Sequence, residues 1–583
     1  MNSILPAIPV TAPLDDPFYY LTNFRFVLGW VSERHDDLLG EPERDFIAGF
    51  ARMPLPSQAL LVRMVMRKGE HFRTSRLGYD EIGDPLAALE PLVAAGWVED
   101  DPPLTLDELF RQLRLGELRR ALGGDIVAAG LPALASKAAL LATLLPMHTT
   151  ERRLGEWWPG VQAGERIVRL TVMPVCERLR LMFFGNLHQG WAEFVLAELG
   201  VQRFERVTFG AESRAFQRRE QVDAYLMLHR LRERLEQGES PGVIRGDVPE
   251  VPEGNAWLAE RRARLLYRLG QQAERAGQHE LALTLYADGG CGESGQVDAR
   301  IRRLRLLERL GEHGRALALA SLTFDSATGD TPVSETECQA IERLLPRLRR
   351  RLGLPAATRP SEPTPERWEY RLERQSPGGT IMGVEQAVCV HLSRPDAPVY
   401  YVENALLTGL FGLLCWPALF APLPGAFFHP FHSGPADLYR HDFVARRRDL
   451  FDACLARLED GSYREAILAT WHDRQGVSSP FVYWDVLDET LIDRALACIP
   501  ASHLHACFDR MLADLRANRA GLPDLIQFLP EDGPDQPRYR LIEVKGPGDR
   551  LQDNQRRWLA FFHAQGIPTA VCHVTWQSRD AAS

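Results

Sequence analysis

The chain has 583 residues, of which 45% are hydrophobic and 25% charged, and its formal net charge is −10. This composition predicts several ordinary globular domains and excludes a protein coated in basic surface, so nucleic-acid binding requires local basic patches. Nine cysteines without a C-x-x-C pair or a Cys/His cluster argue against a disulfide framework or a structural zinc, and fit a reducing cytoplasm.

One uncharged run, which starts at Asn404, is long enough for a membrane span, but Pro417, Pro422 and Pro424 interrupt it. We expect a buried helix and a loop there. The N-terminus also lacks the basic-then-apolar order of a signal peptide. No membrane association is expected.

Residues 1–103 are predicted to form a winged-helix-like, DNA-binding domain. The stretch SQALLVRMVMRKG reads as a helix with basic side chains four residues apart on one face. The spread of basic residues suits phosphate contacts rather than base reading, and a solvated helix face is the alternative. The candidate DNA-binding residues are Arg63, Arg67, Lys68, Arg73 and Arg76.

Residues 104–175 begin with a capping box, Thr105-x-x-Glu108, which starts a helix. A loop and a second helix follow, and the pair resembles a degenerate SAP module, a small helical DNA-binding fold. Lys137 lies at the junction of loop and helix, where a helix N-terminus and a cation can share a phosphate. Lys137 is therefore a sixth candidate DNA contact.

Residues 176–354 are predicted to be a helical platform. Gly277 and Gly311 open similar segments, GQHELAL and GEHGRAL, 34 residues apart (311 − 277 = 34), which is the period of a tetratricopeptide repeat. Two repeats are fewer than independent stability usually needs. We expect the helices to join domains, with binding of a protein partner as the alternative.

A Pro-rich linker is predicted over residues 355–370, and the last domain over 371–583. In GVEQAVCVHL, Glu385 shares a helix face with Val388 and Leu392. A carboxylate there is costly unless it is paired or binds metal, although a rotated helix could expose it. Glu403, at the start of the next helix, is interpreted as a cap or a supporting acid. Gln555 lies similarly among apolar residues of a later helix and needs a polar partner.

The stretch from Gly521 to Lys545 predicts a β-hairpin with charged ends. Leu525–Leu529 and Tyr539–Val544 read as strands bounded by turn residues. Glu543 and Lys545 would point to one face, near Asp524 at the start of the partner strand. Two carboxylates and an amine in this arrangement suit a divalent-metal site, although chance also produces such spacing.

Lysine usage favours the functional interpretation of Lys545. Only Lys68, Lys137 and Lys545 occur among 68 basic residues. Where arginine has replaced lysine so widely, a remaining lysine suggests a need for a compact ammonium group.

GLPDL and LIEVKGPGDRLQDNQRRWL resemble the VRR-NUC branch of the PD-(D/E)xK nucleases. FYYLTNF, LLVRMVMRKGEHFR and ENALLTGLFGLLCW extend the resemblance, so the whole chain is similar to bacterial members of the Fanconi-anaemia-associated nuclease family. The implied fold is mostly α-helical N-terminal modules followed by an α/β restriction-endonuclease-like domain, with a mixed sheet flanked by helices. Trp416-Pro417 departs from the family's usual Trp-Asp.

The resemblance implies a catalytic set, with Mg²⁺ or Mn²⁺ as one or two ions, bound by carboxylates and the Val544 carbonyl. It implies cleavage of 5′ flap and related branched double-stranded DNA in interstrand-crosslink repair. We separately expect a monomer, located in the cytoplasm as the cysteine usage indicates. A Holliday-junction resolvase and a non-catalytic repair adaptor are the alternatives. The catalytic set is Glu385, Asp524, Glu543, Lys545 and Gln555.

Overall fold

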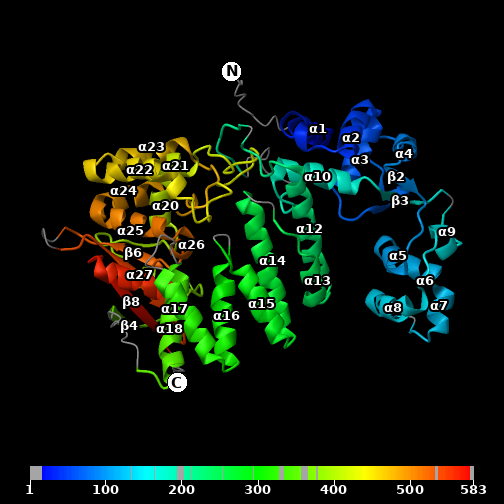
Figure 1. The fold of residues 1–583 in the computed structure, drawn as a ribbon. Coiled ribbons are helices and arrows are strands. Elements are labelled where there is room, and N and C mark those ends of the chain that lie inside the picture. The colour runs from blue at the N-terminus through cyan, green and yellow to red at the C-terminus, as the bar shows by residue number, and fades with distance from the viewer. Residues whose placement is uncertain are drawn as a thin grey trace, which may run out of the picture. The chain divides into compact units, whose positions relative to one another are not determined.

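The computed structural model describes residues 16–577 except 133, 163, 192, 195–201, 211, 252–253, 293–294, 327–333, 356–364, 376–378 and 532–535 (Figure 1). The described residues divide into two compact units. One extends to Gln202 and includes Arg214–Val222, and the other contains Arg203–Ser213 and the chain from Asp223 onward. Most of the predicted linker and the turn of the predicted hairpin lie outside the described residues.

The first unit begins with helices around a small antiparallel sheet, in the order β1-β3-β2. The third strand comes from beyond the SAP-like segment and pairs with both neighbours. Phe24, Phe46 and Phe50 contact one another in the buried core, which is why the amphipathic N-terminal stretches become helices. The elements are α1 (Tyr19–Arg34), α2 (Glu41–Arg52), α3 (Leu55–Val65), β1 (His71–Arg73), α4 (Pro85–Ala94), β2 (Val98–Asp100), β3 (Ile167–Leu170) and α10 (Met173–Phe184).

The SAP-like segment forms short helices around its own apolar cluster, which includes Leu109, Phe110 and Trp157. The predicted capping box is present: the Glu108 N–H donates to Thr105 Oγ1 at 3.3 Å, and the Thr105 N–H donates to Glu108 Oε2 at 2.9 Å. The helices are α5 (Leu106–Gln112), α6 (Leu115–Ala121), α7 (Gly123–Ala128), α8 (Lys137–Leu144) and α9 (Leu154–Trp157).

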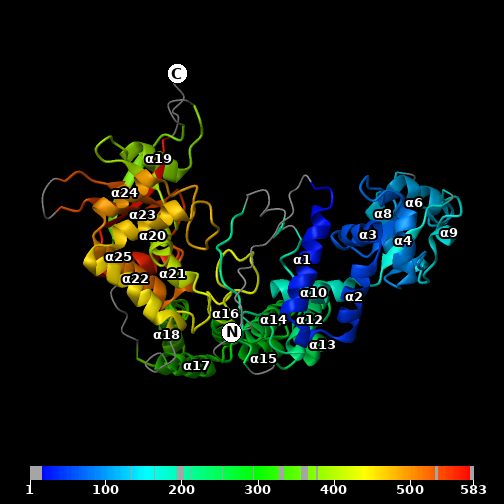
Figure 2. The ribbon, with the colours of Figure 1, turned by 90° about the horizontal axis from the view of Figure 1, so that it is seen from above.

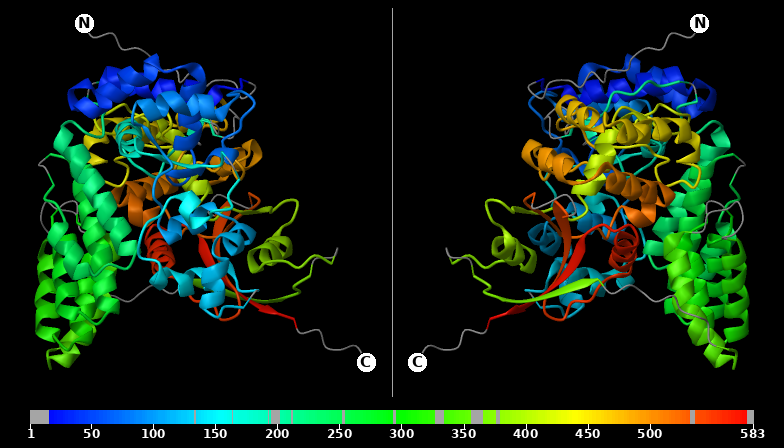
Figure 3. Two further views of the ribbon diagram at one scale, coloured as in Figure 1. Left: turned by 90° about the vertical axis from the view of Figure 1, so that its right-hand side faces the viewer. Right: turned by 90° about the vertical axis from the view of Figure 1, so that its left-hand side faces the viewer.

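The chain passes from the first unit into the second within α12 (Arg219–Glu236). Helix α13 (Pro241–Asp247) follows, and then the repeat-like helices, which stand side by side in a row (Figure 3, green). Gly277 and Gly311 lie in the turns between paired helices with φ of 73° and 81°, a conformation that favours glycine. Ala282 and Ala316, at matching repeat positions, are both fully buried. The row contains α14 (Ala256–Arg275), α15 (His279–Gly289), α16 (Val297–Arg309), α17 (His313–Ser326) and α18 (Glu335–Arg351).

The carboxy-terminal part of this unit is built on a five-stranded mixed sheet. Its strands, in spatial order, are β4 (Glu366–Leu372), β8 (Thr569–Trp576), β7 (Tyr539–Lys545), β6 (Leu525–Phe528) and β5 (Val399–Tyr401). The β4–β8 and β8–β7 pairs are parallel, and the other two pairs are antiparallel. The predicted mixed sheet is therefore confirmed. Strand β4 begins at Glu366, within the segment interpreted as a linker.

Helices flank this sheet. Val388 of α19 (Val384–Leu392) lies in one apolar cluster with Ile542 and Val544 of the sheet. Every residue of α20 (Leu406–Leu414) is buried, as expected for the uncharged run. The other helices, several of which gather around α20 in Figure 2, are α21 (Trp416–Leu419), α22 (Arg448–Asp460), α23 (Tyr463–Asp473), α24 (Glu489–Cys498), α25 (Ala501–Ala513), α26 (Leu515–Asn518) and α27 (Asp553–Ala564). Within the described ranges, no helix is both long and apolar enough to cross a membrane.

Candidate active site

The charged ends of the β6–β7 hairpin face one another. Leu525 pairs with Ile542 in antiparallel register, so the preceding residue, Asp524, stands opposite Glu543. The two predicted strands and their pairing are confirmed. Asp524 is 7% exposed and Glu543 1%, so both carboxylates have lost most of their contact with water.

Glu543 receives two donors at one of its oxygen atoms. Lys545 Nζ lies 2.7 Å from Glu543 Oε1, and Gln555 Nε2 donates to the same oxygen at 2.6 Å. The side-chain carbonyl oxygen of Gln555, Oε1, accepts from the Gln552 backbone N–H at 2.8 Å and so caps the start of α27. The structure therefore brings Glu543, Lys545 and Gln555 together and fixes the orientation of the glutamine amide from both ends.

Asp524 is fixed from the opposite strand, because the Val544 N–H donates to its Oδ2 at 2.7 Å. The segment before it makes a close approach to α27. Gly521 has φ of +91°, and a Cβ atom there would lie 2.7 Å from the Asn554 side chain and 2.8 Å from its backbone. The glycine of GLPD is thus needed both for its backbone conformation and for the space it leaves.

Burial raises the pKa of both carboxyl groups. The pKa of Asp524 rises to about 6, because burial and the charges of Glu403 and Glu385 outweigh the Val544 hydrogen bond and Lys545. Burial, followed by the charge of Asp524, raises the pKa of Glu543 to about 8 despite Lys545. Negative charge is therefore crowded in a buried place, where a bound cation would relieve it.

Two further acids act on Asp524. Glu385, in the first turn of α19, is partly exposed, and its charge contributes to the raised pKa of Asp524. Glu403 contributes more to that pKa, although the sequence suggested only a cap or a supporting acid. Glu403 is not the cap, since α20 starts at Leu406 with Ala405 at its N-cap position. Glu403 lies two residues after the end of β5 (Val399–Tyr401). The periodicity of the sequence does not predict where this strand ends, so it does not place Glu403 near Asp524.

The residues at this site fit a hard divalent cation. Glu543 Oε2 is buried and has no hydrogen-bond partner, so an acceptor remains available beside Asp524. No three His, Cys, Asp or Glu side chains in the described part of the chain are close enough to form a full metal-binding set. The two carboxylates would therefore supply part of the set, as in Mg²⁺ sites that use one or two carboxylates together with water and substrate phosphate.

The predicted DNA-binding residues divide into two groups, of which the first is partnered within the protein. Arg73 is buried and pairs with Glu117 at 2.7 Å and with Glu165 at 2.9 Å. Arg63 donates to Glu81 at 2.6 Å and lies over the ring of Tyr20.

Lys137 also has an internal partner, because its Nζ donates to the Leu113 carbonyl at 2.8 Å. Arg67, Lys68 and Arg76 are exposed, and Arg67 also donates to the Arg76 carbonyl at 3.2 Å. Helix α3 ends at Val65, so Arg67 lies in the turn beyond the helix on which it was predicted. These exposed residues form the part of the predicted patch that is open to a phosphate backbone.

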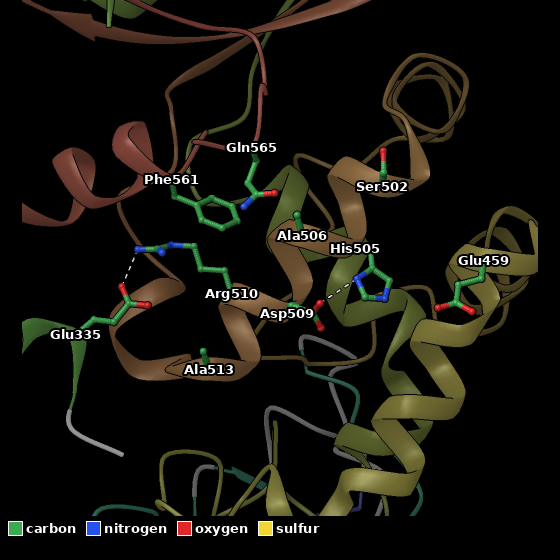
Figure 4. A pocket seen from close by; sticks show the side chains of 10 residues that line it. All are labelled: Glu335, Glu459, Ser502, His505, Ala506, Asp509, Arg510, Ala513, Phe561 and Gln565. Carbon is green, nitrogen blue, oxygen red and sulfur yellow. Dashed lines mark hydrogen bonds and ion pairs between the residues drawn. The ribbon is translucent and has the colours of Figure 1, made fainter. Parts of the chain in front are cut away.

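A cavity of about 690 Å³ lies away from the hairpin site, between α22, α25, α27 and the start of α18 (Figure 4). Glu335, Glu459 and Asp509 line it together with Arg510 and Phe561, and Arg510 is paired with Glu335 at 2.6 Å. The excess of carboxylates makes this cavity unsuited to a phosphate backbone.

The mixed sheet and the Asp524, Glu543 and Lys545 site define the class of PD-(D/E)xK nucleases. Family models agree: the VRR-NUC domain model matches residues 458–576, the FAN1 HTH domain model matches 18–99, and the Fanconi anemia-associated nuclease SAP domain model matches 103–157. The VRR-NUC match implies dependence on a divalent metal.

Whole-chain similarity is high. The chain is 50% identical to a Fanconi-associated nuclease 1 homolog of Pseudomonas aeruginosa, over 98% of this chain and 99% of that one. It is 25% identical to human Fanconi-associated nuclease 1, over 95% of this chain and 62% of the human protein. A crystal structure of paFAN1 bound to 2-nucleotide 5′ flap DNA with a gap matches with a TM-score of 0.90 and 49% identity, over 98% of this chain and 100% of that one. The chain belongs to the Fanconi-associated nuclease family.

Proposed function

We propose that this protein is a structure-selective, divalent-metal-dependent DNA nuclease that cleaves 5′ flap and related branched DNA in interstrand-crosslink repair. The single observation that carries the proposal is the buried pair of carboxylates, Asp524 and Glu543. Lys545 forms an ion pair with Glu543 Oε1, and Glu543 Oε2 has no hydrogen-bond donor. The paFAN1 structures with 1- and 2-nucleotide 5′ flap DNA support the choice of substrate.

The proposed metal is Mg²⁺ or Mn²⁺. Asp524 and Glu543 would bind it directly, with the Val544 carbonyl as a further oxygen ligand and Glu385 acting through water or on a second ion. Carboxylate, carbonyl and water are the ligands that these cations prefer. The ion would supply charge neutralisation at the scissile phosphate and a more acidic water.

The protein's own groups then orient the reactants. Lys545, held 2.7 Å from Glu543, presents an ammonium that orients the attacking water or stabilises charge on the phosphate. Gln555 keeps the Glu543 carboxylate in place, because its amide is fixed at both ends. Burial of both carboxylates keeps bulk water from screening these charges.

We propose that Arg67, Lys68 and Arg76 contact the DNA backbone. All three side chains are exposed. Arg63 and Arg73 are instead paired with acids and support the fold that presents the patch, and the exposed Lys137 is bonded to the Leu113 carbonyl. Contacts of this type position a duplex without reading its sequence.

The test uses end-labelled 5′-flap, 3′-flap, four-way-junction and linear DNA, each incubated with the full chain in Mg²⁺ or in chelator. We expect cutting of the 5′ flap near the branch in Mg²⁺ and none in chelator. Symmetric cutting of the four-way junction would indicate a resolvase, and binding without any cutting would indicate an adaptor.

We also propose a monomer in the cytoplasm, with the repeat-like helices available to a protein partner. A resolvase needs two symmetric active sites, whereas a flap nuclease needs one. Light scattering of the free and the DNA-bound protein therefore distinguishes a resolvase from a flap nuclease. A mass of one chain on the flap supports the flap nuclease, and a mass of two chains supports the resolvase.

A further inference from the structure

The sheet continues past Lys545 on one side of the hairpin site. Strand β7 ends at Lys545, whereas its parallel neighbour β8 runs on to Trp576. Lys545 pairs with His573 in register, so the two side chains leave the same face of the sheet. Because neighbouring strands lie about 4.8 Å apart, His573 stands directly beside the lysine of the site.

Strand β4 extends this face outward. Glu369 pairs with His573, and Arg371 pairs with Thr575, both in parallel register. Side chains two residues apart on a strand share a face, so these four residues lie on the same side of the sheet as Lys545. We call the surface formed by Glu369, Arg371, His573 and Thr575 the β4–β8 ledge.

The ledge is open, unlike the part of the same face that holds the carboxylates. Helix α27 covers the face at Glu543, which Gln555 contacts, and Val571, which pairs with Glu543, is only 2% exposed. Beyond this cover His573 is half-buried, and the other three side chains of the ledge are exposed. A ligand that reaches Lys545 therefore has an uncovered sheet surface next to it.

His573 offers a hydrogen-bond donor that the protein does not use. Its imidazole makes no hydrogen bond to another residue in the described part of the chain. Burial and then the charge of Arg367 lower the pKa of His573, Glu369 acts in the opposite direction, and Lys545 lowers the pKa further. The ring is therefore neutral near pH 7 and carries one N–H donor.

The free charge on the ledge belongs to Arg371. Arg367, on the same strand, is paired with Glu369 at 2.8 Å, so these two charges offset each other. Arg371 is exposed and forms no ion pair with any residue that the structure describes. A neutral donor beside the site, followed by a cation about 7 Å further along the strand direction, suits the phosphates of one DNA strand.

We propose that the β4–β8 ledge binds the cleaved DNA strand beside the scissile phosphate, with His573 donating to the neighbouring phosphate and Arg371 contacting a phosphate further along. The inference rests on the proposed nuclease function and adds two substrate contacts outside the hairpin. The ledge fixes the position of the strand relative to Lys545, and so sets which phosphodiester bond is cut.

The experiment removes each contact from both sides. Single-turnover cutting in Mg²⁺ is measured on 5′-flap DNAs in which one phosphate at a time, on either side of the cut, is replaced by an uncharged methylphosphonate. The variants are His573→Ala, His573→Gln, which keeps an N–H donor, and Arg371→Ala. His391→Ala is the matched control, because His391 lies against Tyr370 on the opposite face of the sheet.

Replacing one phosphate next to the cut should slow wild-type cutting about tenfold or more, and the same replacement should cost His573→Ala little further, because its contact is already absent. His573→Gln should keep most of the wild-type rate, and His391→Ala should match the wild type on every DNA. For flap binding in Ca²⁺, the slope of log affinity against log salt should fall by about 1 in Arg371→Ala and stay unchanged in His573→Ala.

Wild-type cutting by His573→Ala, or losses that multiply with His573→Ala at every replaced phosphate, would overturn the contact of His573. An unchanged salt slope would overturn that of Arg371. If His573→Ala does not fold, as judged by circular dichroism, His573→Gln and the exposed Arg371→Ala decide. Failure of the wild type to cut unmodified flap DNA would refute the proposed function, and the methylphosphonate series measured by binding in Ca²⁺ would still test the ledge.

Discussion

Lys545 is the residue on which the chemistry of the hairpin depends most. Its ammonium is nearly buried and lies 2.7 Å from Glu543 Oε1, in a chain that otherwise uses arginine almost throughout. A guanidinium is planar, larger and bidentate, so it cannot present the same point charge in the same space. Lysine is rare in this chain, and the position of Lys545 beside Glu543 gives a physical reason why lysine rather than arginine stands there.

Lys545→Arg and Lys545→Ala should both lower flap cutting roughly a hundredfold or more, because each removes the compact charge from the reacting phosphate or water. Single-turnover cutting in Mg²⁺ measures the effect, with DNA affinity measured in Ca²⁺. Lys68→Arg is the control, since that exposed lysine needs only a positive charge and should retain cutting. Near-normal cutting by Lys545→Arg would remove the argument for an ammonium.

The raised pKa values of Asp524 and Glu543 predict how pH affects the metal-free protein. Both folded-state values lie above the ordinary carboxyl range, so the folded protein binds extra protons between about pH 4 and pH 8. Its stability is then fully present at the acidic end of this window and is lost as the pH rises through it. Mg²⁺ should restore stability most at the alkaline end.

Thermal unfolding in chelator at pH 5.5 and 8.5 measures this effect. The melting temperature of the wild type should fall more between the two pH values than that of Glu543→Gln, which cannot ionise there. Equal falls in the two proteins would show that Glu543 does not change its protonation state between the two pH values, which contradicts the raised pKa.

At the scale of elements, the sequence predicted those that depend on local pattern. The structure confirms three such predictions: the hairpin strands, the capping box at Thr105 and the buried helix α20. Alternation, capping residues and apolar runs are local signals, which is why the sequence predicts these features. The pairing of β3 with β1 and β2 is not predicted from the sequence, since β3 starts 67 residues after the end of β2 (167 − 100 = 67) and 94 after the end of β1 (167 − 73 = 94). The partners of Arg63, Arg73 and Lys137 also come from other elements, so their internal roles could not be read from spacing.

Gly521 ties the hairpin to α27 and gives a prediction at this scale. Gly521→Ala should destabilise the protein by about 2 kcal/mol or more, because it combines a positive φ with a clash against Asn554. Gly548→Ala is the matched control: its φ is +86°, but no atom lies within 4 Å of the added Cβ. Denaturant unfolding should therefore show a smaller loss for Gly548→Ala, and equal losses would mean that the close approach costs nothing.

For the whole molecule, DNA affinity must come from a few exposed basic residues on an acidic chain. Its net charge of −10 provides no general attraction, so each phosphate contact matters. The mixed-sheet fold and the hairpin acids followed from local pattern and family resemblance. The position of Glu403 beside Asp524 required the register of β5 on β6, which only the folded chain reveals.

Removing Lys68 and Arg76 together should weaken binding of flap DNA and lower the slope of log affinity against log salt by about 2, one for each lost contact. Stability should not change, because both side chains are exposed. Arg73→Ala should instead destabilise the fold by about 3 kcal/mol, since it leaves Glu117 and Glu165 without their buried partner. An unchanged salt slope in the double variant would exclude this patch from the DNA interface.

The central claim is that the hairpin acids are where DNA is cut, and one measurement tests it most directly. Wild type and Asp524→Ala are compared for Mg²⁺-dependent cutting of an end-labelled 5′-flap DNA, with binding of the same DNA measured in Ca²⁺. The account predicts loss of cutting with binding retained in Asp524→Ala. Cutting at the wild-type rate by Asp524→Ala would contradict it.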